Sequence, residues 1–165
     1  MKNYILTEEV AEKKLRRLAY EILENNASEK ELILAGIRDN GSVIARIIRQ
    51  MLLDITGGGI EIGLIDISLD KRSPGAIELS GEGSFDGKVI IVIDDVASSG
   101  KTLLYALKPF LAFHPRKIEA LVLVGRMHKA FPVQPDYTGL SLSTTLQEHI
   151  YVEVEGDRVK GAWLE

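Results

Sequence analysis

Val-Ile-Ile-Val-Ile-Asp-Asp-Val-Ala-Ser-Ser-Gly-Lys-Thr, residues 89–102, is the stretch that decides the fold of this chain. Its first five residues are all β-branched and apolar, a run too short for a helix and typical of a central strand buried on both faces. Asp94 and Asp95 end this expected strand, and the apolar spacing of residues 102–113 predicts one amphipathic helix after a short turn. The stretch therefore predicts a strand, a loop and a helix, with polar groups at the joint.

The turn has the composition of a phosphate-binding loop. Its residues are Ala97, Ser98, Ser99, Gly100, Lys101 and Thr102. Backbone N–H groups, three hydroxyls and a helix N-terminus can converge there on one phosphate monoester. Asp94 and Asp95 would repel that phosphate, so a group that donates hydrogen bonds or carries positive charge, such as sugar hydroxyls or Mg²⁺, explains them better. A phosphate beside a diol describes a ribose 5-phosphate.

Two other interpretations of this stretch explain less. A nucleoside-triphosphate P-loop requires glycine five positions before Gly100, and this chain has Asp95 there. A purely structural pair of aspartates, which only ends a buried strand or caps a helix, leaves the hydroxyl-rich loop without a reason. We therefore keep the ribose 5-phosphate interpretation.

Residues 89–102 resemble the 5-phosphoribosyl-1-pyrophosphate (PRPP) motif of the type I phosphoribosyltransferases. The resemblance implies an α/β fold with a mainly parallel central sheet, helices on both faces and ligands at the carboxyl ends of the strands. It implies Mg²⁺-dependent transfer of ribose 5-phosphate from PRPP to a nucleobase, which yields a nucleoside monophosphate and pyrophosphate. Asp94 and Asp95 would be catalytic and metal-binding, and residues 97–102 would hold the 5-phosphate.

A second strand, loop and helix are expected in residues 31–53. Glu31–Ala35 predicts a short strand, residues 36–41 form a glycine-bounded loop, and the apolar spacing that follows predicts a helix through Leu53. Taken alone, this unit is an ordinary connection. The resemblance makes it the pyrophosphate loop, whose expected ligands are Ile37, Arg38, Asp39, Asn40 and Gly41.

Residues 70–87 hold four glycines and a proline and show little periodicity. A segment of this length without regular structure is functional or disordered when it lies inside a compact domain. The resemblance makes it a flexible hood loop that closes over the reacting centre and excludes water, which would capture an oxocarbenium-like transition state. Lys71 and Arg72 at its root are candidates for contacts with the pyrophosphate.

Near the C-terminus the resemblance narrows to PyrR-like proteins, regulators of pyrimidine operons that also have uracil phosphoribosyltransferase activity. It rests on the run Arg-x-His-Lys at residues 126–129, a proline, and Asp-Tyr-x-Gly at residues 136–139. Strands expected at residues 150–154 and 158–164 fit the same family. The resemblance favours uracil as the base and implies base contacts from Arg126, Tyr137, Thr138 and Gly139.

The chain departs from PyrR-like sequences near the expected substrates. Asn40 stands where arginine is usual, Gly125 stands where aspartate is usual, and residues 140–145 replace a Lys-Asn-Ile-Pro-Thr-Ser type segment. Ser98 stands where 6-oxopurine enzymes hold an aspartate that handles the N7 proton, and a serine hydroxyl has too high a pKa for that task. Ser98 favours a pyrimidine, or a base that arrives ready to react, over a 6-oxopurine. The other changes leave the identity of the base open, and they leave open a PyrR-like RNA-binding regulator or a PRPP or nucleotide sensor that does not transfer.

The bulk composition is that of an ordinary globular protein. The chain has 165 residues, 45% hydrophobic and 27% charged, a size that suits one domain spanning residues 1–165. It has no cysteine, and its three histidines lack metal-ligand spacing. No apolar run approaches the roughly 20 residues of a membrane span, and no signal peptide is recognisable, so we expect a cytoplasmic protein without a membrane partner.

RNA is a possible partner that the charge pattern does not favour. The formal net charge is −4, and nucleic-acid binding needs a contiguous basic face. The first expected helix carries Lys13, Lys14, Arg16 and Arg17, but Glu9 and Glu12 precede two of these by four residues. We interpret this helix face as solvated and salt-bridged, and we carry over a homo-oligomer from the family as an expectation.

Overall fold

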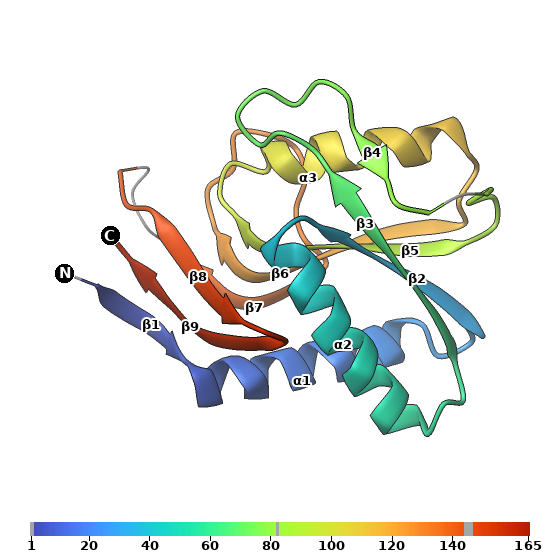
Figure 1. Ribbon diagram of the computed structural model, residues 1–165, viewed down its shortest axis with the longest axis horizontal. Helices are drawn as coiled ribbons and strands as arrows, with labels where there is room; N and C mark the ends of the chain where they lie inside the picture. Colours follow the sequence, from blue (N-terminus) through green and yellow to red (C-terminus); the bar gives the residue numbers. More distant parts are fainter. Residues whose placement is uncertain (1, 82, 144–146) are drawn as a thin grey trace.

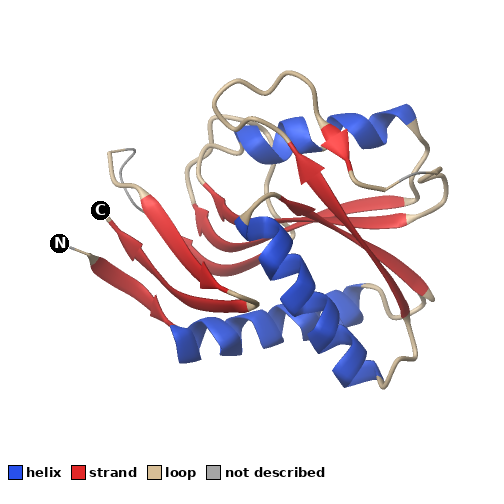
Figure 2. Cartoon of the chain, viewed as in Figure 1, coloured by secondary structure: helices blue, strands red, loops and turns tan. Residues whose placement is uncertain are grey.

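Six strands form the central sheet of the computed structural model, which describes residues 2–81, 83–143 and 147–165 (Figures 1 and 2). Their order is β4-β3-β2-β5-β6-β7, and every neighbouring pair except β3–β4 is parallel. The bounds are β2 (Glu31–Ile37), β3 (Glu61–Ser68), β4 (Glu78–Leu79), β5 (Val89–Ala97), β6 (Lys117–Arg126) and β7 (Tyr137–Leu142). The prediction of an α/β fold with a mainly parallel sheet is confirmed.

Strand β5 is central, as its sequence predicts. It pairs with β2 on one side and β6 on the other, and residues 89–93 are all buried. Ile91 and Ile93 pack on the face covered by α1 (Glu8–Asn25) and α2 (Asn40–Thr56), whereas Ile90 and Val92 pack towards α3 (Lys101–Ala106) and the 3₁₀ helix η1 (Lys108–Ala112). Helices therefore cover both faces, as expected (Figure 1).

The helix ends follow local chemistry. The hydroxyl of Thr7 accepts a hydrogen bond from the Val10 N–H at 3.3 Å and caps α1, and Gly57 ends α2 in a left-handed conformation with φ of 62°. Ion pairs of 3.1 Å between Glu9 and Lys13 and of 4.0 Å between Glu12 and Arg16 confirm the salt-bridged face of α1. None of the described helices is long and apolar enough to cross a membrane.

Three local predictions were wrong. Strand β5 continues to Ala97, so Asp94 and Asp95 lie inside it and not beyond its end. The single helix expected over residues 102–113 is divided into α3 and η1, because Pro109 has no N–H to donate and its ring would clash with a preceding carbonyl in a continuous helix. Val10, expected on the buried face of α1, is 41% exposed, and Ala11 takes the buried position.

A second, antiparallel sheet stands beside the central one and carries both termini (Figure 1). Its order is β1-β9-β8, with β1 (Asn3–Thr7), β8 (Ile150–Glu155) and β9 (Arg158–Leu164). Leu6, Val152 and Ala162 join its inner face to the core that also contains α1 and α2. We call this element the small sheet. Its β8 and β9 match the strands predicted at residues 150–154 and 158–164.

The segment 70–87 has little regular structure, apart from the two residues of β4 that pair with the end of β3. Residue 82 of this predicted hood loop lies outside the described residues. In Figure 1 the segment arches on the side of the sheet that α3 covers. Its far end is held by Phe85, which is 6% exposed and packs edge-on against Phe110 and Phe113 with ring centroids 5.2 Å apart.

We call residues 38–41, which include the first two residues of α2, the β2–α2 connection. This segment approaches β5 so closely that Gly41 has no room for a side chain. A Cβ at Gly41 would lie 2.5 Å from the carbonyl oxygen of Ile93 and 3.1 Å from the Cα of Asp94. We expect Gly41→Ala to lower the free energy of unfolding by about 2 kcal/mol, because backbone atoms must shift to admit the methyl group. Urea denaturation measures this. Gly75→Ala is the matched control, since no atom lies within 4 Å of its Cβ position, and an equal loss in both variants would contradict the account.

Candidate functional site

Asp94 and Asp95 lie near the carboxyl end of β5 in different surroundings. Asp94 is fully buried, whereas the side chain of Asp95 is 13% exposed. Burial raises the pKa of the Asp94 carboxyl well above its ordinary value, the Asp95 carboxylate adds to this rise, and Lys71 opposes it. The two carboxylates accept the N–H groups of Asp95 and Val96, respectively, each at 2.8 Å. Asp95 is therefore the member of the pair that reaches the surface, whereas Asp94 is covered in this structure.

Lys71, at the root of the segment 70–87, supplies the positive charge that the pair needs. Its Nζ lies 3.2 Å from both carboxylate oxygens of Asp94 and 3.8 Å from Oδ1 of Asp95. Burial alone would lower the pKa of Lys71, but the charges of Asp94 and Asp95 outweigh burial and raise the pKa. The side chain is still 44% exposed, so Lys71 reaches the pair from the surface of the protein.

The β2–α2 connection meets the acidic pair, as the resemblance implied for the pyrophosphate loop. Asn40 donates from Nδ2 to Oδ2 of Asp95 at 2.9 Å, and Gly41 abuts Asp94. The Arg38–Asp39 peptide bond is cis, and the guanidinium of Arg38 turns towards Asp66 at 3.7 Å. This connection thus lies at the pair, while its arginine is 54% exposed and faces Asp66 instead.

The loop after β5 is held by hydrogen bonds from the connection between β6 and β7. The carbonyl of Ser99 accepts the N–H groups of Ala130 and Phe131, both at 3.0 Å. Gly100 adopts φ of 87° against this connection, where a Cβ would lie 3.2 Å from the carbonyl of Phe131. The hydroxyl of Ser99 accepts the N–H of Lys101 at 3.2 Å. The loop is therefore held in shape before any ligand binds.

A cavity of about 260 Å³ lies above the loop and next to the acidic pair. Residues 97–102, the predicted ligands of the 5-phosphate, all line it, together with Asp95 but not Asp94. The remaining lining residues are Lys71, Val96, Leu103 and Ile150. Sequence reasoning missed Val96 and Ile150, which give the cavity apolar surface. Val96 directly follows the aspartates, but nothing in the sequence signals that Ile150 of the small sheet reaches the same place.

The predicted base contacts are not brought together in this cavity. The Tyr137 side chain is 2% exposed and its hydroxyl donates to Glu119 at 2.9 Å, in the core beside the end of α1. The carbonyls of Thr138 and Gly139 accept hydrogen bonds from Arg17 at 3.2 and 2.8 Å, because β7 is an edge strand. A base-binding role for these three residues does not follow from their positions.

Among the predicted base contacts, Arg126 lies next in sequence to the residue that pairs with Ala97, where the loop of residues 97–102 begins. It ends β6, directly after Gly125, which pairs with Ala97. The side chain is 3% exposed and donates to the carbonyl of Glu148, and its own carbonyl accepts from Lys129. Burial, and then the charge of Arg126, lower the pKa of Lys129. Residues 144 and 145 of the divergent segment 140–145 lie outside the described residues.

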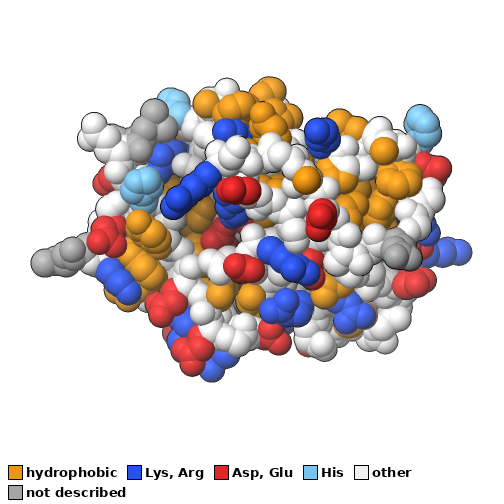
Figure 3. Space-filling model, turned by 45° about the horizontal axis from the view of Figure 1, so that its top comes forward, with side chains coloured by type: hydrophobic (Ala, Val, Ile, Leu, Met, Phe, Trp, Pro, Cys, Tyr) orange, Lys and Arg blue, Asp and Glu red, His pale blue; other side chains and the backbone are white. Residues whose placement is uncertain are grey.

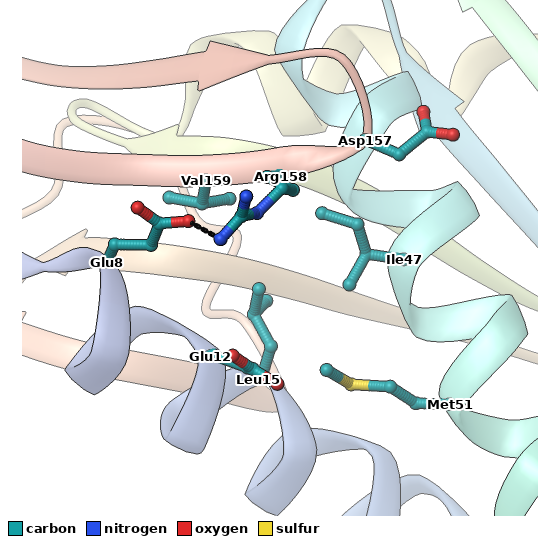
Figure 4. Close-up of a pocket in the computed structure, with 8 residues that line it drawn as sticks. All are labelled: Glu8, Glu12, Leu15, Ile47, Met51, Asp157, Arg158 and Val159. Carbon is teal, nitrogen blue, oxygen red and sulfur yellow. Dashed lines mark ion pairs between the residues drawn. The ribbon is translucent and has the colours of Figure 1, made fainter.

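A separate pocket of about 170 Å³ opens between α1, α2 and the β8–β9 turn (Figure 4). Leu15, Ile47 and Met51 point into it, and the ion pair between Glu8 and Arg158 crosses it. Arg158 also lines this pocket, but no glycine-rich loop and no Ser or Thr hydroxyl does. Of these two cavities, the one at the end of β5 has the groups of a phosphate-binding loop.

The acidic pair fits a magnesium ion that is shared with a substrate. Among the described residues no group of three or more His, Cys, Asp or Glu side chains forms a complete cage. Mg²⁺ does not need one, because it is commonly held by one or two carboxylates together with substrate phosphates and water. Asp95 and, once Lys71 moves, Asp94 are the residues placed for this role.

The cavity, the acidic pair and the loop thus lie together at one end of a mainly parallel sheet. The chain belongs to the phosphoribosyl transferase domain family, whose model matches residues 3–155. It is similar to proteins named bifunctional protein PyrR. The protein from Streptococcus uberis is 34% identical over 158 residues, 93% of this chain and 91% of that protein, and PyrR 1 from Lactiplantibacillus plantarum is 32% identical over 151 residues, 86% and 84%.

Solved structures share the fold. The hypoxanthine phosphoribosyltransferase of Trypanosoma cruzi has a TM-score of 0.78 at 14% identity and covers 99% of this chain and 97% of its own. A hypoxanthine-guanine phosphoribosyltransferase from Bacillus anthracis has a TM-score of 0.72 at 20% identity, with 86% and 83% covered. The predicted family and its fold are confirmed.

We expect Lys71→Met to destabilise the protein increasingly as the pH rises from about 5 to 7.5. A carboxyl whose pKa is raised on folding costs stability once the unfolded chain has lost its proton, and without Lys71 the pKa of Asp94 rises further. Since Lys71 is partly exposed, the expected loss at pH 7.5 is roughly 1 to 2 kcal/mol. Urea denaturation at both pH values measures it. Lys13→Met, which removes an exposed ion pair on α1, should show no such trend; a loss in Lys71→Met that did not grow with pH would refute the pairing.

Proposed function

We propose that this protein catalyses Mg²⁺-dependent transfer of ribose 5-phosphate from PRPP to a nucleobase, with uracil favoured, and releases pyrophosphate. The observation that carries the proposal is the convergence of three groups at one end of the sheet. A braced loop of backbone N–H groups and hydroxyls lines the same cavity as Asp95, and Asn40 of the β2–α2 connection donates to that carboxylate at 2.9 Å. A 5-phosphate, a ribose diol and a pyrophosphate need these three groups in this order.

The chain's own residues act by positioning and by excluding water. Residues 97–102 hold the 5-phosphate, and Asp94 and Asp95 orient the ribose hydroxyls. The backbone of residues 37–41 faces the pyrophosphate. Bound Mg²⁺ supplies positive charge to the leaving group. Lys71 is freed from Asp94 when the ligand neutralises the pair, and the segment that it begins then covers the ribose, so that water does not capture the reacting carbon.

The pyrimidine preference rests on the chemistry of Ser98 and on the curated relatives. Ser98 lines the cavity with a hydroxyl and not a carboxylate, and it does not serve as a base for the N7 proton of a 6-oxopurine at neutral pH. The relatives at 32 and 34% identity are named PyrR, the group whose resemblance implied uracil. Val96 and Ile150 offer apolar surface for a planar base.

Pyrophosphate release from PRPP and Mg²⁺ tests the proposal, with uracil, orotate, hypoxanthine, guanine and adenine supplied one at a time. We expect release with uracil and none with the purines. Release with a purine alone would overturn the base preference and keep the transferase. Failure with every base, in protein that still binds PRPP, would favour a sensor that does not transfer.

Asp95→Asn should lower kcat/KM at least about tenfold, roughly 1.4 kcal/mol of transition-state stabilisation. The amide keeps the shape of the side chain but loses the charge that faces the ribose and the metal. Steady-state pyrophosphate release measures the effect. Asp54→Asn, at an exposed position of α2, makes the same chemical change away from the site and should leave kcat/KM unchanged. Equal values for Asp95→Asn and wild type would make the pair structural.

A PyrR-like RNA-binding regulator is the second candidate. One observation favours it: Arg16, Arg46 and Arg49 line one hollow of about 450 Å³. Against it, Asp54 and Asp157 line the same hollow, Arg17 is engaged with Glu21 and the edge of β7, and described basic and acidic side chains alternate on the face shown in Figure 3. RNA binding that weakens steeply with salt would support this candidate. A cytoplasmic location and a homo-oligomeric assembly, with residues 1–165 as one domain, remain part of the proposal.

A further inference from the structure

We infer that Asn40 is a positioning residue that clamps the small sheet to Asp95, so that the wall of the cavity carrying Ile150 and the ligand-facing carboxylate are held as one unit. Its Nδ2 donates to Oδ2 of Asp95 at 2.9 Å and to the backbone carbonyl of Val152 at 2.9 Å. This inference deepens the proposed function and rests on it for its effect on catalysis.

The chemistry of this position requires two donated hydrogens. Both neighbours of the Asn40 amide, the carboxylate of Asp95 and the carbonyl of Val152, are acceptors only. The NH₂ group has two hydrogens and uses one for each acceptor, which also fixes the orientation of the amide. A serine hydroxyl donates one hydrogen, and an aspartate would place a third carboxylate against two acceptors. Asn40 is thus matched to its two partners.

The carbonyl of Val152 needs this partner because of its place in the sheet. Strand β8 pairs only with β9 among the described strands, so its other edge presents unpaired backbone groups. Two residues before Val152 lies Ile150, which lines the cavity. The bond from Asn40 therefore sets how far β8, and Ile150 with it, stands from the carboxyl end of β5.

The same amide orients Asp95. Oδ1 of Asp95 accepts the Val96 N–H at 2.8 Å, and Oδ2 accepts from Asn40. One hydrogen bond on each oxygen fixes the carboxylate plane and leaves further lone pairs for ribose hydroxyls. Without Asn40 the carboxylate loses one of these two restraints, and the distance between the diol-binding group and the apolar wall is no longer fixed.

Three variants of Asn40 separate the effect of hydrogen-bond donation from the effect of side-chain size. Asn40→Leu keeps the approximate size without donors, Asn40→Ala removes both, and Asn40→Gln keeps two amide hydrogens on a longer stem. We expect kcat/KM for PRPP to fall about tenfold in Asn40→Leu and Asn40→Ala and to recover to within about threefold of wild type in Asn40→Gln. If Asn40→Leu equals wild type, or if Asn40→Gln falls as far as Asn40→Ala, donation is not the role.

Hydrogen exchange and unfolding test the clamp without catalysis. We expect the amides of residues 150–155 to exchange at least about threefold faster in Asn40→Ala than in wild type, both free of ligand. The unfolding free energies of Asn40→Ala and Asp95→Ala should not add in the double variant, because the two residues share one contact. Unchanged exchange in β8, or additive effects, would overturn the inference.

Gln50→Ala is the matched control. Gln50 is an exposed amide ten residues further along the chain in α2, and its Nε2 donates to Asp54 at 2.9 Å. Its removal should change neither kcat/KM nor exchange in β8, and an effect equal to that of Asn40→Ala would contradict a specific clamp. If wild-type protein transfers to no base, the proposed function fails while exchange and the double-variant cycle still decide the clamp.

Discussion

The charge of the acidic pair at the end of β5 has to be balanced, and the surrounding structure is arranged to balance it. Asp94 is fully buried beside Asp95, and two like charges so close in a low-dielectric interior are costly unless each finds a partner. Lys71 supplies a cation to Asp94, and Asn40 supplies a hydrogen bond to Asp95. Each partner comes from a different element, so the pair joins the hood segment and the β2–α2 connection to the central strand.

Lys71 and Asn40 hold the acidic pair by different kinds of contact, and this difference suits a binding site. The contact of Lys71 is electrostatic, comes from a partly exposed side chain, and can be replaced by another positive group. The contact of Asn40 is a directed hydrogen bond anchored at the start of a buried helix and shared with the small sheet. Under the proposed function, a ligand that brings magnesium displaces Lys71, while Asn40 keeps the carboxylate and the apolar wall of the cavity at a fixed distance.

The central strand and the turn that follows it could be predicted from residues 89–102, because both depend on short-range patterns. Five β-branched residues specify a buried strand, and small residues with a glycine specify a turn, whose proposed role in phosphate binding stays a prediction. The break at Pro109 was also visible in the sequence but was outweighed by apolar spacing. Asp94 and Asp95 were placed past the strand because a buried carboxylate inside a central strand is unfavourable unless a distant lysine compensates it.

Long-range contacts account for what the sequence could not reveal. Ile150 reaches the cavity from a strand that begins 48 residues after Thr102, the last residue of the loop, and Asn40 contacts Val152 of the other sheet. Tyr137 looked like a ligand contact because of its motif. The register of β7 directs the Tyr137 side chain into the core, where its hydroxyl donates a hydrogen bond to the carboxylate of Glu119. Side-chain direction in an edge strand depends on register, which a single sequence does not determine.

The most direct measurement is calorimetric titration of the protein with PRPP in the presence of Mg²⁺, repeated with ribose 5-phosphate and with pyrophosphate. The account predicts saturable binding of PRPP at one site per chain and weaker binding of each fragment, because the loop, the acidic pair and the β2–α2 connection act on one ligand together. Absence of PRPP binding, or PRPP binding no tighter than that of either fragment, would contradict it.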